Sequence, residues 1–331
     1  MINAAIVGLG WWGRKIVGSL KPSEKLRITR AVDANPGAAG AFAAEHGLPL
    51  AHSLDEVLPD AGIDAVILAT PHSLHEAQIV AAAGAGKHVF CEKPLTLTRS
   101  GAARAIAACE QAGVALGVGH ERRFEPAMVE IKRLIDSGAL GTIMHAESNF
   151  SHDKLANVPA GDWRASAVDA PAAGMTGMGI HLTDAYINML GSVIEVFAQT
   201  ARRILPAENG DVVSVQLRFA SGATGYFSAI LATPLYLRYQ VFGSDAWVEA
   251  RDTAHPDSEG ETHLTIHRKG GEPESRTFRS IDTVRANIEA FADAAARRSP
   301  YPIPTAQKLH NIATLEAICK SAESGMPVTV D

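Results

Sequence analysis

Short apolar runs separated by alanine-rich segments dominate the first 120 residues of the chain. The apolar runs are continuous rather than alternating, as in Ala65–Ala69 (AVILA), and this pattern is typical of strands buried on both faces of a parallel sheet. The segments between them have the length and composition of helices. We therefore predict repeated strand–helix–strand units and a parallel sheet. Strands are expected at 2–7, 28–32, 65–69, 88–90 and 114–118, and helices at 38–46, 74–83 and 100–112.

The pattern changes after about residue 121. Apolar runs now follow one another closely, with turn residues rather than helices between them, which favours an antiparallel sheet. We expect an α/β chain in two domains, with a boundary at 121 and an α+β second domain built on a large open sheet. The second domain is predicted to contain strands at 143–151, 193–203, 211–220, 223–232, 236–243, 246–250 and 262–268, and helices at 126–137, 284–297 and 305–325.

Composition narrows the class of partner. The 331 residues include 36 acidic and 30 basic side chains, a formal net charge of −6, and this balance argues against nucleic acid or an anionic membrane surface as the main partner. No apolar run approaches the ~18 residues that would span a bilayer, and no basic leader precedes the first apolar run. The three cysteines have no metal-ligand spacing. We expect a cytoplasmic protein without a metal site.

A glycine-rich turn follows the first predicted strand. Gly8, Gly10 and Gly13 form the pattern G-x-G-x-x-G and open a helical segment. The first glycine allows a tight turn, the second allows backbone to approach a pyrophosphate, and the third allows the helix to pack on the strand. The helix N-terminus offers N–H groups to phosphates. An ordinary strand–helix turn would carry the same glycines, so the surrounding sequence must decide.

Asp33 supplies part of that context, because it ends the second predicted strand 25 positions after Gly8. An acid near this distance binds the 2′-hydroxyl of the adenosine ribose in NAD and repels the 2′-phosphate of NADP. No arginine occurs among the next four residues, 34–37, so we predict NAD as the cofactor, with NADP less favoured. The alternative is an aspartate that merely forms the turn before Asn35-Pro36.

Several longer motifs resemble one enzyme family. The segment 86–94 (GKHVFCEKP) is similar to the signature of the glucose–fructose oxidoreductase, inositol dehydrogenase and MocA (Gfo/Idh/MocA) family. Segments 32–36 (VDANP), 69–75 (ATPHSLH), 119–124 (GHERRF) and 179–184 (GIHLTD) match the family in order and spacing. The resemblance implies an NAD(P)-binding Rossmann domain, 1–121, and a C-terminal domain, 122–331, with a mainly antiparallel sheet that binds substrate and forms homodimers or homotetramers. It also implies hydride transfer between nicotinamide and a secondary alcohol or carbonyl of a sugar, polyol, dihydrodiol or related cyclic compound.

Two residues are the predicted catalytic groups. Lys93 follows a predicted strand at its carboxyl end, where open α/β sheets bind ligands, and near a nicotinamide it could exchange a proton with the substrate oxygen. The resemblance implies that His181 works beside this lysine as substrate ligand or acid/base. A surface lysine in a Lys-Pro turn and a structural histidine remain the alternatives.

The remaining predicted site residues fall into two groups. Those implied to contact the cofactor, besides the three glycines, Asp33 and Lys93, are Trp11, Trp12, Ala69, Thr70, Pro71, His72, His75 and Glu92. Those offered as substrate contacts are Arg122, Arg123, Trp163, Arg164 and Asp184. Structural ion pairs are an equally good account of the two adjacent arginines, and His75 is expected to hydrogen-bond backbone.

One position departs from the family pattern. Many members have an aspartate four residues before the histidine, where this chain has Gly177. Either Lys93 and His181 suffice, or Asp162 or Asp169 supplies a polar group, or the activity differs. Two alternatives to a dehydrogenase therefore stay open, a non-catalytic NAD(P)-binding sensor and an NAD-using glycoside hydrolase.

Overall fold

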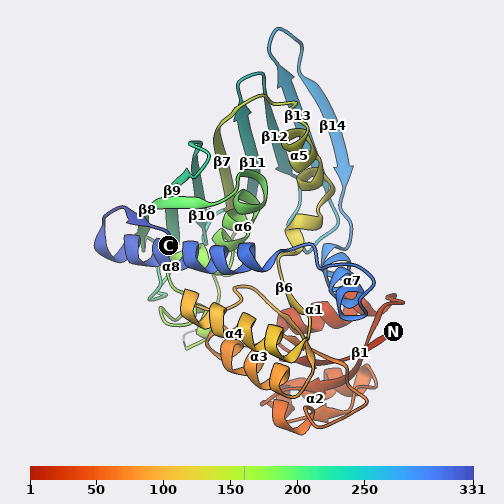
Figure 1. Ribbon diagram of the computed structural model, residues 1–331. Helices are drawn as coiled ribbons and strands as arrows, with labels where there is room; N and C mark the ends of the chain where they lie inside the picture. The colour runs from red at the N-terminus through yellow and green to blue at the C-terminus, as the bar shows by residue number, and fades with distance from the viewer. Residues whose placement is uncertain (160) are drawn as a thin grey trace. The chain divides into compact units, whose positions relative to one another are not determined.

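The computed structural model describes residues 1–159 and 161–331 (Figure 1). The chain forms two compact units: Met1–Glu121 with Asp282–Leu309, and Arg122–Ile281 with His310–Asp331. The sequence prediction placed residues 282–309 in the second domain, whereas this segment packs with the first unit. The reason is a helix whose apolar face is buried against the first sheet.

The first unit contains a six-stranded parallel sheet in the order β3-β2-β1-β4-β5-β6. The predicted parallel sheet and Rossmann-type architecture are confirmed. The strand order reverses between β1 and β4, and ligands of such sheets bind outside the carboxyl ends at this point. The strands are β1 Ile2–Val7, β2 Leu26–Val32, β3 Leu50–Ala51, β4 Ala65–Leu68, β5 His88–Cys91 and β6 Leu116–Val118.

Five helices complete this unit, and one of them comes from late in the chain. Phe291 of this late helix is fully buried, with its ring 5.6 Å from that of Phe90 on β5. Asn287 Nδ2 and Tyr301 Oη each donate a hydrogen bond of 2.9 Å to the carbonyl of Val118 at the end of β6. These contacts fix residues 282–309 to the first unit. The helices are α1 Trp11–Leu20, α2 Pro36–Glu45, α3 His75–Gly84, α4 Arg99–Ala112 and α7 Thr283–Ala295.

The second unit is built on a nine-stranded sheet in the order β14-β13-β12-β11-β7-β10-β9-β8-β15. Neighbouring strands run antiparallel except β7 and β10, which are parallel. The expected large, mainly antiparallel sheet is therefore confirmed. The strands are β7 Ile143–Ser151, β8 Val193–Ala201, β9 Val212–Phe219, β10 Thr224–Ile230, β11 Tyr236–Gly243, β12 Ala246–Asp252, β13 Glu261–Arg268, β14 Glu274–Arg279 and β15 Val328–Thr329.

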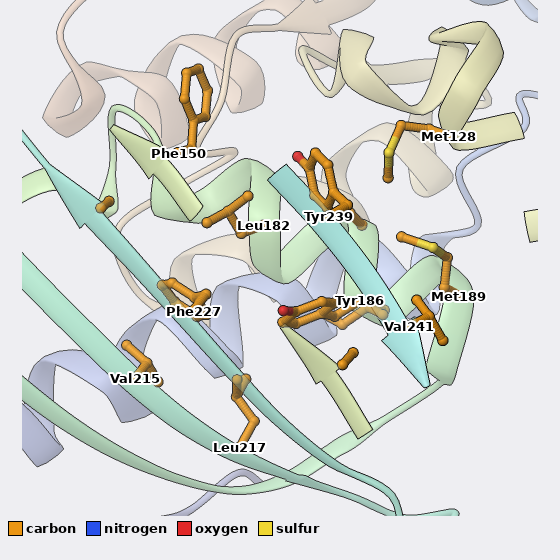
Figure 2. Packing of buried hydrophobic residues seen from close by; sticks show 14 of the residues in the cluster. Met128, Phe150, Leu182, Tyr186, Met189, Val215, Leu217, Phe227, Tyr239 and Val241 are labelled. Carbon is orange, nitrogen blue, oxygen red and sulfur yellow. The ribbon is translucent and has the colours of Figure 1, made fainter. Parts of the chain in front are cut away.

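The core of this unit lies between one face of the sheet and its helices. Alternate residues of the strands are buried, as in β9, and Leu182 and Tyr186 of α6 pack among them (Figure 2). Tyr186 Oη donates to the carbonyl of Tyr226 on β10 at 2.7 Å and accepts from Ser148 on β7 at the same distance. The helices are α5 Pro126–Asp136, α6 Gly179–Leu190 and α8 Thr305–Ser324, whose first residues belong to the first unit.

In the described part of the chain, short 3₁₀ helices lie in the connections at Leu54–Glu56, His72–Leu74, Glu121–Phe124, Trp163–Ala165 and Ala173–Met175. None of the helices in residues 1–159 and 161–331 combines the length and apolar character needed to cross a membrane.

Candidate functional site

The three glycines after β1 each meet a different constraint. Gly8 has φ +94°, and a Cβ there would lie 2.6 Å from the carbonyl oxygen of Ala69. A Cβ on Gly13 would overlap the carbonyl oxygen of Gly8. The first turn of α1 therefore packs directly against the glycine turn. Around Gly10, by contrast, a Cβ would have no atom within 4 Å among the described residues. The glycine that should receive a pyrophosphate therefore faces open space.

The start of α1 adds hydrogen-bond donors to that space. The helix begins at Trp11, and its N-cap residue is Gly10, which provides no side-chain cap. The first N–H groups of a helix have no partner within it, and they carry the positive end of the helix dipole. Open space in front of uncapped N–H groups fits a phosphate group of a dinucleotide.

Asp33 stands at the end of β2 beside this turn. Its Oδ2 accepts a hydrogen bond of 2.7 Å from the N–H of Leu9, and its Oδ1 accepts one of 2.8 Å from Asn35. The carboxylate thus joins the second strand to the glycine turn. Sequence reasoning searched only the residues after Asp33 for an arginine and missed Arg14. Arg14 donates to the carbonyl of the same Leu9 at 2.9 Å and to that of Ala38 at 2.6 Å.

The loop after β4 lies on the same edge of the sheet. Nδ1 and Nε2 of His75 lie 2.8 Å from the carbonyl oxygen of Pro94 and 3.0 Å from that of Thr70. His75 therefore ties the loop after β4 to the loop after β5 through backbone, as expected of it. The His72 ring is 5.7 Å from that of His75 and is buried. Ala69, Thr70 and Lys93 are consequently brought to the carboxyl edge that holds the glycine turn.

Glu92 lies next to Lys93 but turns inward. Its side chain is buried against Gly119 at the end of β6, where a Cβ would collide with its carboxyl oxygens. Burial and the negative charge of Glu121 raise the pKa of Glu92 to about 8. The backbone N–H of Lys93 donates to Glu92 Oε2 at 3.3 Å. The residue preceding the predicted catalytic lysine is thus a buried carboxyl that stays protonated near neutral pH.

The second unit carries His181 in the first turn of α6. Its ring is 6.1 Å from that of Phe150 at the end of β7, and the residue is buried. Asp184, three residues later, accepts two hydrogen bonds of 2.7 Å from Arg123. Two of the predicted substrate residues therefore bind each other in a buried ion pair.

Arg122 is also engaged within the second unit. Its Nη2 lies 2.9 Å from carboxylate oxygens of Glu125 and Asp252, and its Nε donates to Tyr239 Oη at 3.3 Å. The guanidinium stacks over the ring of Phe150 at 5.1 Å. Arg122 thus fastens the beginning of the second unit to its sheet.

The loop after β7 holds the other predicted substrate contacts. Arg164 stacks on Trp163 at 4.2 Å and pairs with Asp162 at 3.3 Å. Asp162 already pairs with Arg164, so its carboxylate is only partly available to replace the aspartate that the family pattern has at position 177. A Cβ at Gly177 would lie 3.2 Å from Leu155 Cδ1, so an apolar side chain flanks that position.

Sequence reasoning missed two histidines in this region. His152 follows β7 and His255 follows β12, and their ring centroids are 4.7 Å apart. The only signal available was that each follows a predicted strand. Within residues 1–159 and 161–331, no group of three or more His, Cys, Asp or Glu side chains is placed to hold a metal ion.

The buried Glu92 carboxyl predicts a dependence of stability on pH. A carboxyl that is neutral in the folded chain and ionised in the unfolded chain makes unfolding release a proton, so stability falls as pH rises from 4.5 towards about 8. Glu92→Gln should remove this fall, which amounts to at most about 1.4 kcal/mol per pH unit. Urea unfolding from about pH 5 to about pH 8 measures it, with exposed Glu24→Gln as the control. If the free energies of unfolding of Glu92→Gln and the natural protein differ by the same amount at every pH, the raised pKa of Glu92 is refuted.

Comparisons with known proteins agree for both units. Residues 2–120 match the model described as an oxidoreductase family with an NAD-binding Rossmann fold, and residues 128–249 match the GFO/IDH/MocA C-terminal domain. D-xylose 1-dehydrogenase (NADP(+)) 2 from Haloferax volcanii is 32% identical over 298 residues, covering 88% of this chain and 89% of the relative. Inositol 2-dehydrogenase 1 from Saccharopolyspora erythraea is 29% identical over 345 residues, covering 100% of this chain and 96% of the relative.

Solved structures share the whole architecture. Aldose-aldose oxidoreductase from Caulobacter crescentus, complexed with glycerol, superposes with a TM-score of 0.88 at 25% identity and 99% coverage of both chains. Levoglucosan dehydrogenase in complex with NADH and levoglucosan has the same fold, with a TM-score of 0.87 at 23% identity and 99% coverage of both chains. Sequence, motifs and fold thus agree, and the chain belongs to the Gfo/Idh/MocA family of oxidoreductases.

Proposed function

We propose that this protein is an NAD(P)-dependent dehydrogenase or reductase that interconverts a secondary alcohol and a carbonyl in a sugar, polyol or related cyclic compound. The observation that carries the proposal is the carboxyl edge of the first sheet. Open space at Gly10, the carboxylate of Asp33 and the amine-bearing loop at Lys93 all lie on that edge. Relatives named as xylose and inositol dehydrogenases support the substrate class.

The chemistry assigns the proton to Lys93. The nicotinamide ring, when bound, supplies the hydride acceptor or donor. During oxidation the hydroxyl proton of the substrate passes to Lys93 Nζ, and during reduction it returns. Because Glu92 is protonated near neutral pH, its carboxyl places no fixed negative charge beside Lys93.

His181 is assigned to the substrate. Its place in the first turn of α6, beside the ring of Phe150, gives the imidazole a fixed backbone position. A neutral imidazole both donates and accepts hydrogen bonds, so it suits a hydroxyl or carbonyl oxygen. Asp184 supports the helix through Arg123. We assign it a structural rather than a substrate-binding role.

For the cofactor we propose NAD in preference to NADP. The carboxylate of Asp33 is the group that would accept hydrogen bonds from a ribose diol and repel a 2′-phosphate. The Haloferax relative is named as NADP-dependent, so the preference must be tested. Arg14 hydrogen-bonds the same Leu9 as Asp33. It is therefore the cation that we expect to attract a 2′-phosphate if NADP binds.

Asp33 variants test the preference. Asp33→Ala should lower kcat/KM with NAD and raise the NADP to NAD ratio of kcat/KM by about tenfold or more, because both the diol acceptor and the repulsion are lost. Asp33→Asn removes the negative charge but keeps an oxygen that can accept from the N–H of Leu9. It therefore distinguishes the effect of the charge from the effect of losing this hydrogen bond. Exposed Asp55→Ala is the control. An unchanged ratio in both Asp33 variants would mean that another residue selects the cofactor.

The assigned roles are tested by turnover. With a library of sugars, polyols and dihydrodiols, followed by the absorbance of reduced nicotinamide, Lys93→Ala should lower kcat by about 10²- to 10⁴-fold with little change in the Kd of NAD. His181→Ala should lower kcat/KM, and exposed Lys21→Ala should change neither. Full turnover in Lys93→Ala would remove its role. Tight NAD binding without turnover on any compound would favour the sensor, and release of nitrophenol from nitrophenyl glycosides would favour the glycoside hydrolase.

We also propose a homodimer or homotetramer in a reducing, cytoplasmic compartment. The open face of the second sheet carries a charged cluster in which Arg238 pairs with Glu147 at 2.6 Å and lies 3.6 Å from Glu249. Because this face carries both signs of charge, it can pair with the same face of a second copy. Light scattering should give a multiple of the monomer mass, and a monomer at assay concentration would contradict the proposal. All three cysteines are free thiols, which supports the compartment.

A further inference from the structure

Two histidines near His181 form a polar pair in the second unit. The ring of Phe150 lies 6.1 Å from that of His181, 5.5 Å from that of His152 and 6.0 Å from that of His255. His152 follows β7 and His255 follows β12. Both strands run antiparallel to β11, so their carboxyl ends lie at the same edge of the sheet. The pair therefore belongs to the region that holds the predicted substrate ligand.

The hydrogen bond at His152 fixes where its proton lies. Its Nδ1 accepts a hydrogen bond of 3.2 Å from the backbone N–H of Lys154, so the ring proton is on Nε2. Burial and the neighbouring His255 lower the pKa of His152 to about 4. At neutral pH the ring is uncharged and presents Nε2–H as a donor.

The shortest contact of His255 favours the opposite tautomer. Its Nδ1 lies 2.7 Å from Oδ1 of Asp257, which also accepts from Lys154 Nζ at 2.6 Å and from Ser258 Oγ at 2.9 Å. Although burial opposes ionisation, these donors hold the pKa of Asp257 down to about 2. The backbone N–H of Asp257 also approaches this Nδ1, at 3.3 Å. The carboxylate contact is much shorter and a carboxylate only accepts, so we assign the proton of His255 to Nδ1. Burial lowers the pKa of His255, and its neutral ring presents Nε2 as an acceptor.

The two ring centroids lie 4.7 Å apart, so a small group beside the pair can reach one donor nitrogen and one acceptor nitrogen. No hydrogen bond reaches either of them from residues 1–159 and 161–331, and the side chain of His255 keeps 14% exposure. A hydroxyl is the small group that accepts one hydrogen bond and donates another. We propose that His152 and His255 bind one hydroxyl of the substrate, with His152 as donor and His255 as acceptor.

Other ligands fit the pair less well. Both rings are neutral. The nearby cations Lys154 and Arg122 are each paired with a carboxylate, so a carboxylate or phosphate ligand would gain little net charge attraction. The described residues place no third ligand for a metal ion. The proposal rests on the proposed dehydrogenase function and specifies it further: accepted substrates carry a second hydroxyl besides the one that is oxidised, and this pair selects for it.

Ring-preserving variants test the selection. His152→Phe and His255→Phe keep the aromatic contacts with Phe150 and remove the nitrogens. For a polyol substrate found by the screen, each should raise KM about threefold to tenfold with little change in kcat, because one uncharged hydrogen bond is lost. The deoxy analogue lacking the selected hydroxyl should react equally well with variant and natural protein. His145→Phe, on the open face of the same strand, is the matched control.

A structural role would give a different result. If the cluster only fastens the loop after β12 to β7, His255→Phe should lower the unfolding midpoint and leave the preference for the hydroxylated substrate intact. Retention of that preference in both variants overturns the proposal.

A second measurement does not depend on turnover. In ¹⁵N-histidine NMR spectra, His152 should titrate as the Nε2–H tautomer and His255 as the Nδ1–H tautomer. Adding myo-inositol or D-xylose should shift both signals but not that of His145, and 1,4-dioxane, which has no hydroxyl, should shift neither. Shifts without turnover on any compound would refute the proposed activity while supporting the hydroxyl site. Turnover of myo-inositol or D-xylose without shifts would refute the site alone.

Discussion

The pairing of β1 with β4 is the contact on which the first unit depends. These strands are parallel neighbours, with Val7 opposite Leu68, so the chain leaves both at the same level. Gly8 then lies so close to Ala69 that no larger residue fits. The turn cannot move away from Ala69 without breaking the hydrogen bonds between β1 and β4. The open space at Gly10 and the position of the loop after β4 both follow from this close contact between Gly8 and Ala69.

Burial of charged side chains determines which residues of the second unit have structural roles. Arg122 and Arg123 lie almost wholly inside it, and a buried guanidinium requires carboxylate partners. Asp252 and Asp184 are therefore committed to holding elements together. His152 and His255, by contrast, carry neutral rings near neutral pH. This division explains why the strongest charges in the unit are poor candidates for substrate binding, whereas its histidines are good ones.

Local patterns predicted most of the fold. The apolar runs located nearly all strands of both sheets, and the glycine spacing located the turn. Three edge strands were missed. β14 consists mainly of polar residues, and β3 and β15 are only two residues long, too short for a periodic pattern. The site was harder to predict. Ion pairing of Arg123 with Asp184 depends on packing across 61 positions, and the meeting of His152 with His255 depends on strand order, which no spacing in the sequence encodes.

The return of residues 282–309 to the first unit has a consequence for biosynthesis. Phe291 and Ile288 complete the apolar core around Phe90, yet the ribosome makes them more than 160 residues after β6 ends at Val118. The first unit is thus begun first and finished almost last, with the second sheet synthesised in between. Until its last helix emerges, the nascent sheet exposes an apolar surface that chaperones would recognise. Neither unit can be completed before the ribosome has passed residue 281, because each takes its last segment from the C-terminal end of the chain.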